Sequence, residues 1–371
     1  MMKILVVVDH AVGVSGPHRN VVGSLNALAA RSDVEIRLLT GKIDENEPYV
    51  KGCDIMLGFE PHNVGKMISN EMLIRKAVQG QELIYVPTGL KSFLYAFSAK
   101  GNRKLIVGPN MTPLPIPGRD DHPGKLEAEY MADLWIEASY YRQTHIERVT
   151  NLKIPVVQHA IDTEKFNPKH RDETIWDEYG IPKDQLKVLY VGHDNTLRKG
   201  VEALIKTIEI IAEQPDVAQN LAFIFAGKLS EKNLAKIKSL KNTYPLGFLY
   251  PDRLPKVMAS ADISVVPSSW ENFPFSVMEA MSSGRPIIAG RVGGITEQLG
   301  EGDEATGILL ELGKLGKHTP NASKLMADAI IALAADPEKR QRLGKAARER
   351  VMTHFVEDRL GQDLVDLFTK S

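Results

Sequence analysis

The sequence lacks a second cysteine, because Cys53 is the only one in 371 residues. A lone cysteine excludes a disulfide within the chain and is typical of a reducing compartment, so we expect a cytoplasmic protein. We interpret Cys53 as a small buried apolar side chain and not as a nucleophile.

Long hydrophobic runs are also missing. No apolar run approaches the ~20 residues that a helix needs to span a bilayer, so no transmembrane segment is expected. The first run, 4–8, is too short for a signal peptide and is followed at once by Asp9 and His10. We therefore interpret the start of the sequence as a first core strand.

The sequence also lacks an excess of charge of either sign. The formal net charge is −1. The first 155 residues hold 18 basic against 17 acidic side chains, and the remainder holds 28 against 30. By bulk charge, neither half predicts nucleic acid or an anionic membrane as the default partner.

Short apolar runs do alternate with helical patterns along most of the chain. This alternation predicts parallel, doubly wound sheets, with strands near 4–8, 34–40, 54–57, 83–86, 104–107, 156–157, 186–191, 221–225, 244–248, 263–266, 286–289 and 307–311. Helices are expected at 125–148, at 276–283 and over nearly all of 321–370, among other places. A polar connection after Asp162 separates two such series, so we predict two domains, 1–165 and 166–355.

The stretch 263–295 combines several signals. An apolar run is followed by a loop with two prolines, a helical pattern, a second apolar run and a pair of glycines. Ser276 and Glu279 are spaced as a capping box for the helix 276–283. In open α/β sheets, ligands bind outside the carboxyl ends of the strands. We therefore expect a site at the loop 268–275, which Glu271 and Glu279 flank.

The same residues carry a resemblance to a known family. PSSWENFPFSVMEAMSSGRPIIAGRVGGITEQL resembles the signature of family 4 retaining glycosyltransferases, in which two glutamates stand in an E-x7-E pattern. Glu271 and Glu279 have that spacing, and Gly293, Gly294 and Glu297 complete it. The likeness is specific from about 188 to 310 and only general in the first half.

The resemblance implies a GT-B fold, in which two Rossmann-like domains face a cleft. It implies that the final helix, 356–371, packs back on the first domain. It also implies retaining transfer of a sugar from a nucleotide-diphosphate sugar to an acceptor, a hexosyltransferase-like activity. No D-x-D tripeptide occurs in the chain, which favours metal-independent chemistry, so we expect no metal site and no cofactor beyond the donor.

The resemblance also implies roles for individual residues. Lys199 and Arg198 would meet the donor diphosphate, and Glu271 would orient the sugar; these three are the catalytic candidates. The other donor-binding candidates are His193, where the family usually has arginine, the amides of Phe275 and Ser276, Glu279 for the ribose, and Gly16 and Ser15 in the loop 13–17.

The acceptor side is less defined. His62, Asn110 and Thr112 are the candidates there, and Asn110 and Thr112 stand in a stretch where the family often has histidine. A glycan, a lipid, a protein, a small molecule and modified DNA all remain open as acceptors. Two alternative functions also remain: a nucleotide-sugar 2-epimerase of GT-B fold, and a non-catalytic nucleotide-sugar binding protein. Glu279 alone would be read as a helix cap, and Gly13 with Gly16 as a turn.

Overall fold

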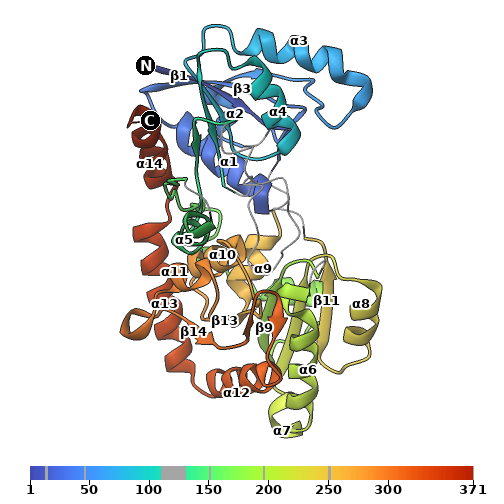
Figure 1. The fold of residues 1–371 in the computed structure, drawn as a ribbon. Coiled ribbons are helices and arrows are strands. Elements are labelled where there is room, and N and C mark those ends of the chain that lie inside the picture. The colour runs from blue at the N-terminus through green and yellow to red at the C-terminus, as the bar shows by residue number, and fades with distance from the viewer. Residues whose placement is uncertain are drawn as a thin grey trace. The chain divides into compact units, whose positions relative to one another are not determined.

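The chain folds into two compact units, which are shown in a computed structural model (Figure 1). Residues 1–12, 16–45, 47–109, 131–149, 152–194, 197–249 and 252–370 are described. Unit 1 comprises Met1–Ala160 with Glu357–Ser371, and unit 2 comprises Ile161–Val356. The first boundary thus lies five residues before the predicted one, and the second lies one residue after it.

Unit 1 is built on a parallel sheet of six strands in the order β5-β3-β1-β6-β7-β8. In that order, the strands are Cys53–Met56, Val34–Leu39, Met2–Val7, Leu83–Val86, Lys104–Val107 and Leu134–Trp135. Successive side chains of β1 point to opposite faces. Ile4 and Val6 therefore join one hydrophobic core, while Leu5 and Val7 join a second.

Helices cover both faces of this sheet. The core of Ile4 and Val6 contains residues of α1 (Gly16–Ala29), α2 (Tyr49–Gly52) and α14 (Glu357–Lys370). The core of Leu5 and Val7 contains residues of α3 (Met67–Ala77), α4 (Leu90–Ala99) and α5 (Tyr140–Val149). Unit 1 is therefore a three-layer α/β unit.

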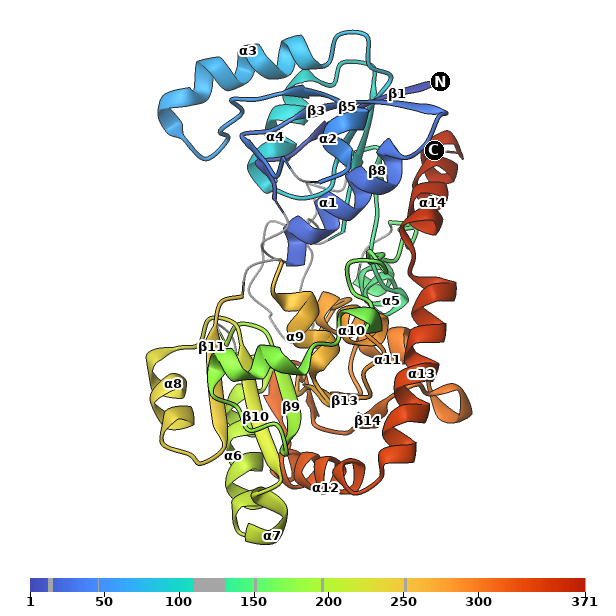
Figure 2. The same cartoon turned by 180° about the vertical axis from the view of Figure 1, so that it is seen from behind.

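Helix α14 belongs to unit 1 although it follows unit 2 in the sequence, and it packs beside α1 (Figure 2). Leu364 and Phe368 lie in the core, almost fully buried. A Cβ at Gly361 would collide with the carbonyl oxygen of Ala27, so glycine permits the close approach of the two helices. The Arg359 guanidinium donates to the carbonyl of His159 at 3.0 Å.

Unit 2 repeats the architecture with the strand order β11-β10-β9-β12-β13-β14, all parallel. In that order, the strands are Thr243–Gly247, Leu221–Ala226, Leu186–Val191, Ile263–Val266, Ile287–Gly290 and Ile308–Leu310. Its helices are α6 (Val201–Ala212), α7 (Pro215–Ala218), α8 (Glu231–Lys238), α9 (Leu254–Ser260), α10 (Phe275–Ser282), α11 (Gly294–Leu299), α12 (Ala322–Ala334) and α13 (Pro337–His354). The strand order reverses at β1/β6 in unit 1 and at β9/β12 in unit 2, and such switch points are where open sheets bind ligands.

Some predicted elements differ from the structure. The predicted helix 125–148 is wrong over 134–135, where buried Trp135 extends the sheet as part of β8, and α5 begins only at Tyr140. The predicted strand 156–157 is reduced to a single bridge between Val156 and Glu137. The helical tail is confirmed as α12, α13 and α14, and Pro337 opens the second of these helices at its first turn.

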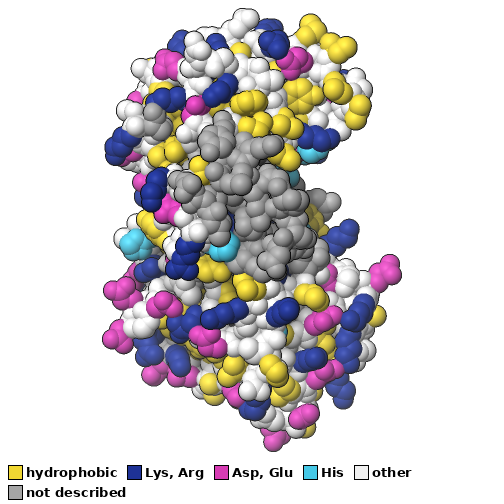
Figure 3. Space-filling model, viewed as in Figure 1, with side chains coloured by type: hydrophobic (Ala, Val, Ile, Leu, Met, Phe, Trp, Pro, Cys, Tyr) yellow, Lys and Arg dark blue, Asp and Glu magenta, His cyan; other side chains and the backbone are white. Residues whose placement is uncertain are grey.

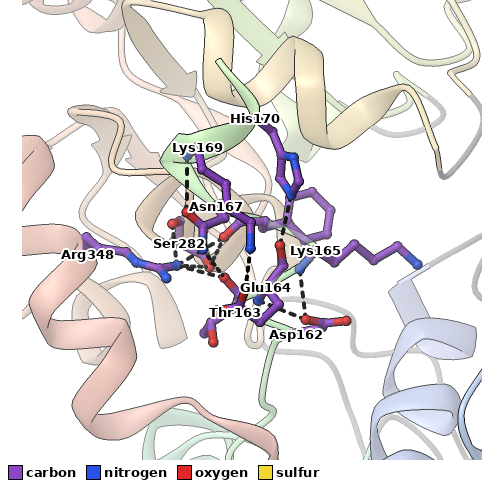
Figure 4. A network of polar contacts seen from close by, with 10 residues as sticks. Asp162, Thr163, Glu164, Lys165, Asn167, Lys169, His170, Ser282 and Arg348 are labelled. Carbon is purple, nitrogen blue, oxygen red and sulfur yellow. Dashed lines mark hydrogen bonds and ion pairs between the residues drawn. The ribbon is translucent and has the colours of Figure 1, made fainter. Parts of the chain in front are cut away.

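A polar network fixes the first residues of unit 2 to α10 and α13 (Figure 4). Nη1 of Arg348 lies 3.1 Å from the carbonyl oxygen of Thr163, 3.0 Å from that of Phe166 and 2.6 Å from that of Ser282. The Ser282 hydroxyl donates to the Phe166 carbonyl at 2.5 Å. One arginine thus holds the segment that enters unit 2.

Among the described residues, no helix combines the length and the hydrophobicity that a membrane span requires.

Candidate functional site

The loops that follow β9 and β12 meet at the carboxyl edge of the unit 2 sheet, at its switch point. The Ser269 amide donates to the carbonyl of Arg198 at 2.8 Å. Gly200 has a φ of +74°, and a Cβ there would collide with the carbonyl oxygen of Pro267. Glycine at 200 therefore lets the two loops come into contact.

Glu271 lies at the centre of this meeting point and is only 5% exposed. The Lys199 ammonium lies 2.6 Å from its Oε1, and Nη1 of Arg198 lies 3.0 Å from its Oε2. The Ser268 hydroxyl also donates to Oε1, at 2.9 Å. One carboxylate between two cations gives this cluster, the Glu271 triad of Glu271, Lys199 and Arg198, a formal charge of +1.

The pKa of Glu271 reflects two opposed effects. Burial raises it, because a charged carboxylate loses its hydration. Attraction by Lys199 and then Arg198, with hydrogen bonds from Lys199 and Ser268, outweighs the burial and holds the pKa below its usual value. Glu271 is therefore ionised at neutral pH.

Arg198 is held on three sides. Besides Glu271, its Nη1 donates to the Trp270 carbonyl at 3.0 Å, and its guanidinium lies 5.1 Å from the centre of the Trp270 ring. A cation over an indole face is attracted by the ring quadrupole. These contacts fix the direction of the arginine. Trp270 therefore positions Arg198.

Helix α10 begins at Phe275, and Pro274 is its N-cap residue, with φ −72° and ψ 131°. The predicted capping box of Ser276 and Glu279 is therefore wrong, because Ser276 is already the second helical residue. Proline has no side-chain acceptor for the amides of the first turn. The amides of Phe275 and Ser276 thus lie in that turn, where the resemblance places phosphate contacts.

Glu279 is the fifth residue of α10, and its side chain is fully buried. It lies one turn behind the helix start and not at the exposed rim of the loop. The interpretation of Glu279 as a helix cap depended on the capping box and is therefore also wrong. Its contact with a ribose stays a prediction.

His193 follows β9 and has a fixed ring orientation. Its Nδ1 accepts a hydrogen bond from the Lys228 amide at 2.9 Å, and its ring stacks on Phe248 with centroids 6.2 Å apart. Because Nδ1 is the acceptor, the neutral ring carries its proton on Nε2 and can donate from there. Next to it, the carboxylate of Asp194 accepts from the amide and the hydroxyl of Ser230, at 2.7 Å each.

The candidates of unit 1 are less concentrated. Gly16 is the first residue of α1, and His62 lies after β5 with its Nε2 3.5 Å from Oδ2 of Asp9. His18 lies 4.0 Å from the other carboxylate oxygen of Asp9. Burial lowers the pKa of His18, and Asp9 acts in the opposite direction. Ser15, Asn110 and Thr112 lie outside the described residues.

Sequence reasoning missed several neighbours of these candidates. Tyr190 lies within a strand that reads as plainly apolar, yet burial and then the nearby Glu271 carboxylate raise the pKa of its hydroxyl. Asp9 was taken only as the end of an apolar run. Its place directly after the first strand, at the switch-point edge, is the signal that identifies it. Among the described residues, no three His, Cys, Asp or Glu side chains are grouped to hold a metal ion.

One protein-family model matches part of the chain. The family model described as "Glycosyl transferases group 1" matches residues 171–350, which lie within unit 2.

Curated relatives match about half of the chain. D-inositol 3-phosphate glycosyltransferase of Corynebacterium glutamicum is 34% identical over 212 residues, which cover 54% of this chain and 48% of that protein. Sulfoquinovosyl transferase SQD2 of Arabidopsis thaliana is 34% identical over 193 residues, which cover 51% of this chain and 35% of that protein. The chain thus spans about half the length, or less, of these curated relatives.

Solved structures resemble the whole chain. The structure of Anabaena HepE in complex with UDP and glucose has a TM-score of 0.77 and 18% identity, over all of both chains. Sucrose-phosphate synthase from Thermosynechococcus elongatus has a TM-score of 0.73 and 21% identity, over 100% of this chain and 99% of that one. At this identity the likeness concerns the fold. It confirms the predicted GT-B class of two Rossmann-like α/β units, while the cleft between them stays a prediction.

Proposed function

We propose that this chain is a glycosyltransferase, because its residues 171–350 match the family model of the group 1 glycosyl transferases. It moves a sugar from a nucleotide-diphosphate sugar to an acceptor hydroxyl, with retention at the anomeric carbon and without a metal. We propose the cytoplasm as its location.

The Glu271 triad is the observation that carries this proposal. A diphosphate leaving group needs positive charge, and Lys199 and Arg198 supply it from one turn beside the buried Glu271. The first turn of α10 adds backbone amides and the positive end of a helix dipole. These groups come from the loops after β9 and β12, where a ligand of an open sheet binds.

The reaction itself needs little covalent chemistry from the protein. The bond between the anomeric carbon and the diphosphate oxygen breaks, and the electron pair leaves with the nucleoside diphosphate. The acceptor oxygen bonds the same face of that carbon, and its proton passes to a phosphate oxygen. Glu271 orients the sugar through its hydroxyls and holds Lys199 and Arg198 in place.

Donor identity can be tested by ligand-linked stabilisation. A thermal-shift screen of UDP-, GDP-, ADP- and dTDP-sugars should raise the unfolding temperature with one nucleotide series and not with the others. Solved structures that resemble this chain contain UDP and UDP-glucose, so UDP-sugars are the first probes. Stabilisation by none of the four series would contradict the proposal.

Product analysis with the stabilising donor separates the proposed activity from its alternatives. Incubation without acceptor should give slow hydrolysis to sugar and nucleoside diphosphate. Conversion of UDP-GlcNAc to its 2-epimer would instead identify an epimerase. Binding with neither hydrolysis nor transfer would identify a binding protein. Turnover should persist in EDTA, and an absolute need for a divalent metal would overturn the metal-independent part.

A further inference from the structure

Exposed apolar side chains gather on one surface of unit 1. Of the fifteen exposed large hydrophobic side chains among the described residues, eight lie between Leu57 and Phe97. The eight are Leu57, Val64, Met67, Ile68, Met72, Leu90, Leu94 and Phe97. Isolated exposed apolar residues are ordinary, but a contiguous group marks an interaction surface. Figure 3 shows hydrophobic side chains grouped over α3 and α4.

The two helices lie in one layer, so their outer faces form one surface. Both pack on the same core, to which α3 contributes Ile74 and α4 contributes Phe93. The Ser98 hydroxyl of α4 donates to the Glu71 carboxylate of α3 at 3.4 Å, which joins the helices side by side. Their remaining sides therefore point away from the sheet together.

The apolar residues follow helical spacing on those outer sides. Ile68 and Met72 are four residues apart on α3, where they are 80% and 68% exposed. Leu90 and Leu94 are four apart on α4, and Phe97 follows three residues later. Residues with this spacing share one side of a helix. We call these five residues the α3–α4 face.

Cations border the α3–α4 face. Lys76 lies one turn after Met72, and Lys91 is next to Leu90. Neither lysine forms an ion pair with a described residue, whereas Glu71 pairs with Arg75 at 2.6 Å. Residues 57–100 hold five basic and three acidic side chains, so the segment has a formal charge of 5 − 3 = +2. The near-zero bulk charge of the first half therefore conceals a local positive border.

We propose that the α3–α4 face docks unit 1 on an anionic lipid surface, with its apolar side chains among the headgroups and Lys76 and Lys91 on the phosphates. An apolar face with a basic border is the pattern of peripheral membrane association. A second copy of the chain fits less well, because a symmetric interface would bring two such segments of charge +2 together. The proposal does not rest on transferase activity, because lipid binding needs neither donor nor acceptor.

Co-sedimentation with vesicles tests the proposal on the full chain. Vesicles of phosphatidylcholine with phosphatidylglycerol should bind the protein, and vesicles of phosphatidylcholine alone should bind it at least about ten-fold more weakly. Binding should fall as ionic strength rises, because salt screens the lysine contacts.

Two double variants address the two parts of the surface. Ile68→Gln with Leu94→Gln removes apolar contact, and Lys76→Gln with Lys91→Gln removes charge. Each should weaken vesicle binding by about ten-fold or more, since one cation at an anionic surface contributes roughly five-fold. All four positions are exposed, so the unfolding temperature should stay near that of the parent. Met352→Gln, at an exposed apolar position on α13, is the matched control and should bind as the parent does.

Three results would overturn the proposal. One is a parent protein that does not bind the anionic vesicles. Another is binding that survives both double variants. The third is a concentration-dependent dimer in analytical ultracentrifugation that the Ile68→Gln, Leu94→Gln variant dissolves, because the face would then bind a second copy of the chain.

Discussion

Glu271 shows how a buried carboxylate can order two cations at once. Removal of one partner from such a group leaves a charge that is poorly compensated, which costs more than the net contribution of the pair. Lys199 and Arg198 are each partly exposed, at 24% and 31% of their side chains, so both can also reach a ligand. The structural role of the triad is therefore compatible with the donor-binding role that we propose for it.

Lys199→Ala should weaken donor affinity by about ten-fold or more, because an ammonium that meets a phosphate makes a charge-assisted contact. Calorimetric titration with the nucleoside diphosphate measures this. Lys206→Ala removes an exposed lysine of α6 and is the control. If Lys199→Ala leaves both donor affinity and turnover unchanged, the phosphate assignment is wrong.

Glu271→Gln should lower turnover by on the order of 10²-fold, since it removes the charge that holds two cations. Stability should respond to pH in a definite direction. The folded-state pKa lies below the reference value of 4.5, so the ionised carboxylate contributes stability that is present above pH 4.5 and lost as pH falls through the folded pKa. The difference in free energy of unfolding between parent and variant should therefore shrink below pH 4.5, as chemical denaturation would measure. A difference that grows on acidification would contradict the assignment.

The sequence predicted the candidates of the triad, but not the contacts among them. Glu271, Lys199 and Arg198 each follow a predicted strand, so their proximity at the carboxyl edge of the sheet was foreseeable. The resemblance implied contacts of both cations with phosphate and of Glu271 with sugar, whereas the structure also joins the three residues in ion pairs. Tyr190 and Asp9 were missed because the direction of a side chain depends on the packing around it.

Helix α10, which lies beside the site, shows that two local sequence signals can predict different first residues for one helix. Ser276 and Glu279 satisfy the capping-box pattern, yet α10 begins one residue earlier. Pro274 explains the shift, because its fixed φ ends the extended loop and the buried Phe275 then anchors the first turn. Sequence patterns locate a helix better than they locate its first residue.

Arg348→Met should destabilise unit 2 by about 2–3 kcal/mol, because carbonyl oxygens of Thr163, Phe166 and Ser282 lose a charged donor. Thermal or urea unfolding measures the change. Arg342→Met, at an exposed arginine of the same helix, should have an effect within about 0.5 kcal/mol. Equal effects of the two variants would show that the network in Figure 4 contributes nothing specific.

At the scale of the whole molecule, periodicity predicted most of both sheets. Eleven of the twelve principal strands were foreseen as separate apolar runs of a parallel sheet, and β8 was the one that was missed. The run at 134–136 is short and lies inside the predicted helix 125–148, so nothing local marks it as a strand. Only the neighbouring strand β7 supplies the pairing that defines it.

Removal of α14 should unfold unit 1 and leave unit 2 folded. A chain that ends at Val356 loses Leu360, Leu364 and Phe368 from the core of unit 1, and each large side chain lost from a core costs about 2–5 kcal/mol. Hydrogen exchange should show loss of protection in β1 and β3 with protection kept in β9 and β12. Removal of Lys370 and Ser371 alone is the control. Retained protection in β1 would contradict the role of α14.

Because α14 follows unit 2 in the sequence, the core of unit 1 is completed only after unit 2 has been synthesised. The ribosome makes the strands of unit 1 first, then all of unit 2, and only then the helix that completes the core of unit 1. Unit 2 is therefore the part that can fold while translation continues, although domains usually fold in order from the N-terminus. Until α14 has been synthesised, one face of the unit 1 sheet is incompletely covered. Nascent unit 1 is therefore the part of the chain to which we expect chaperones to bind.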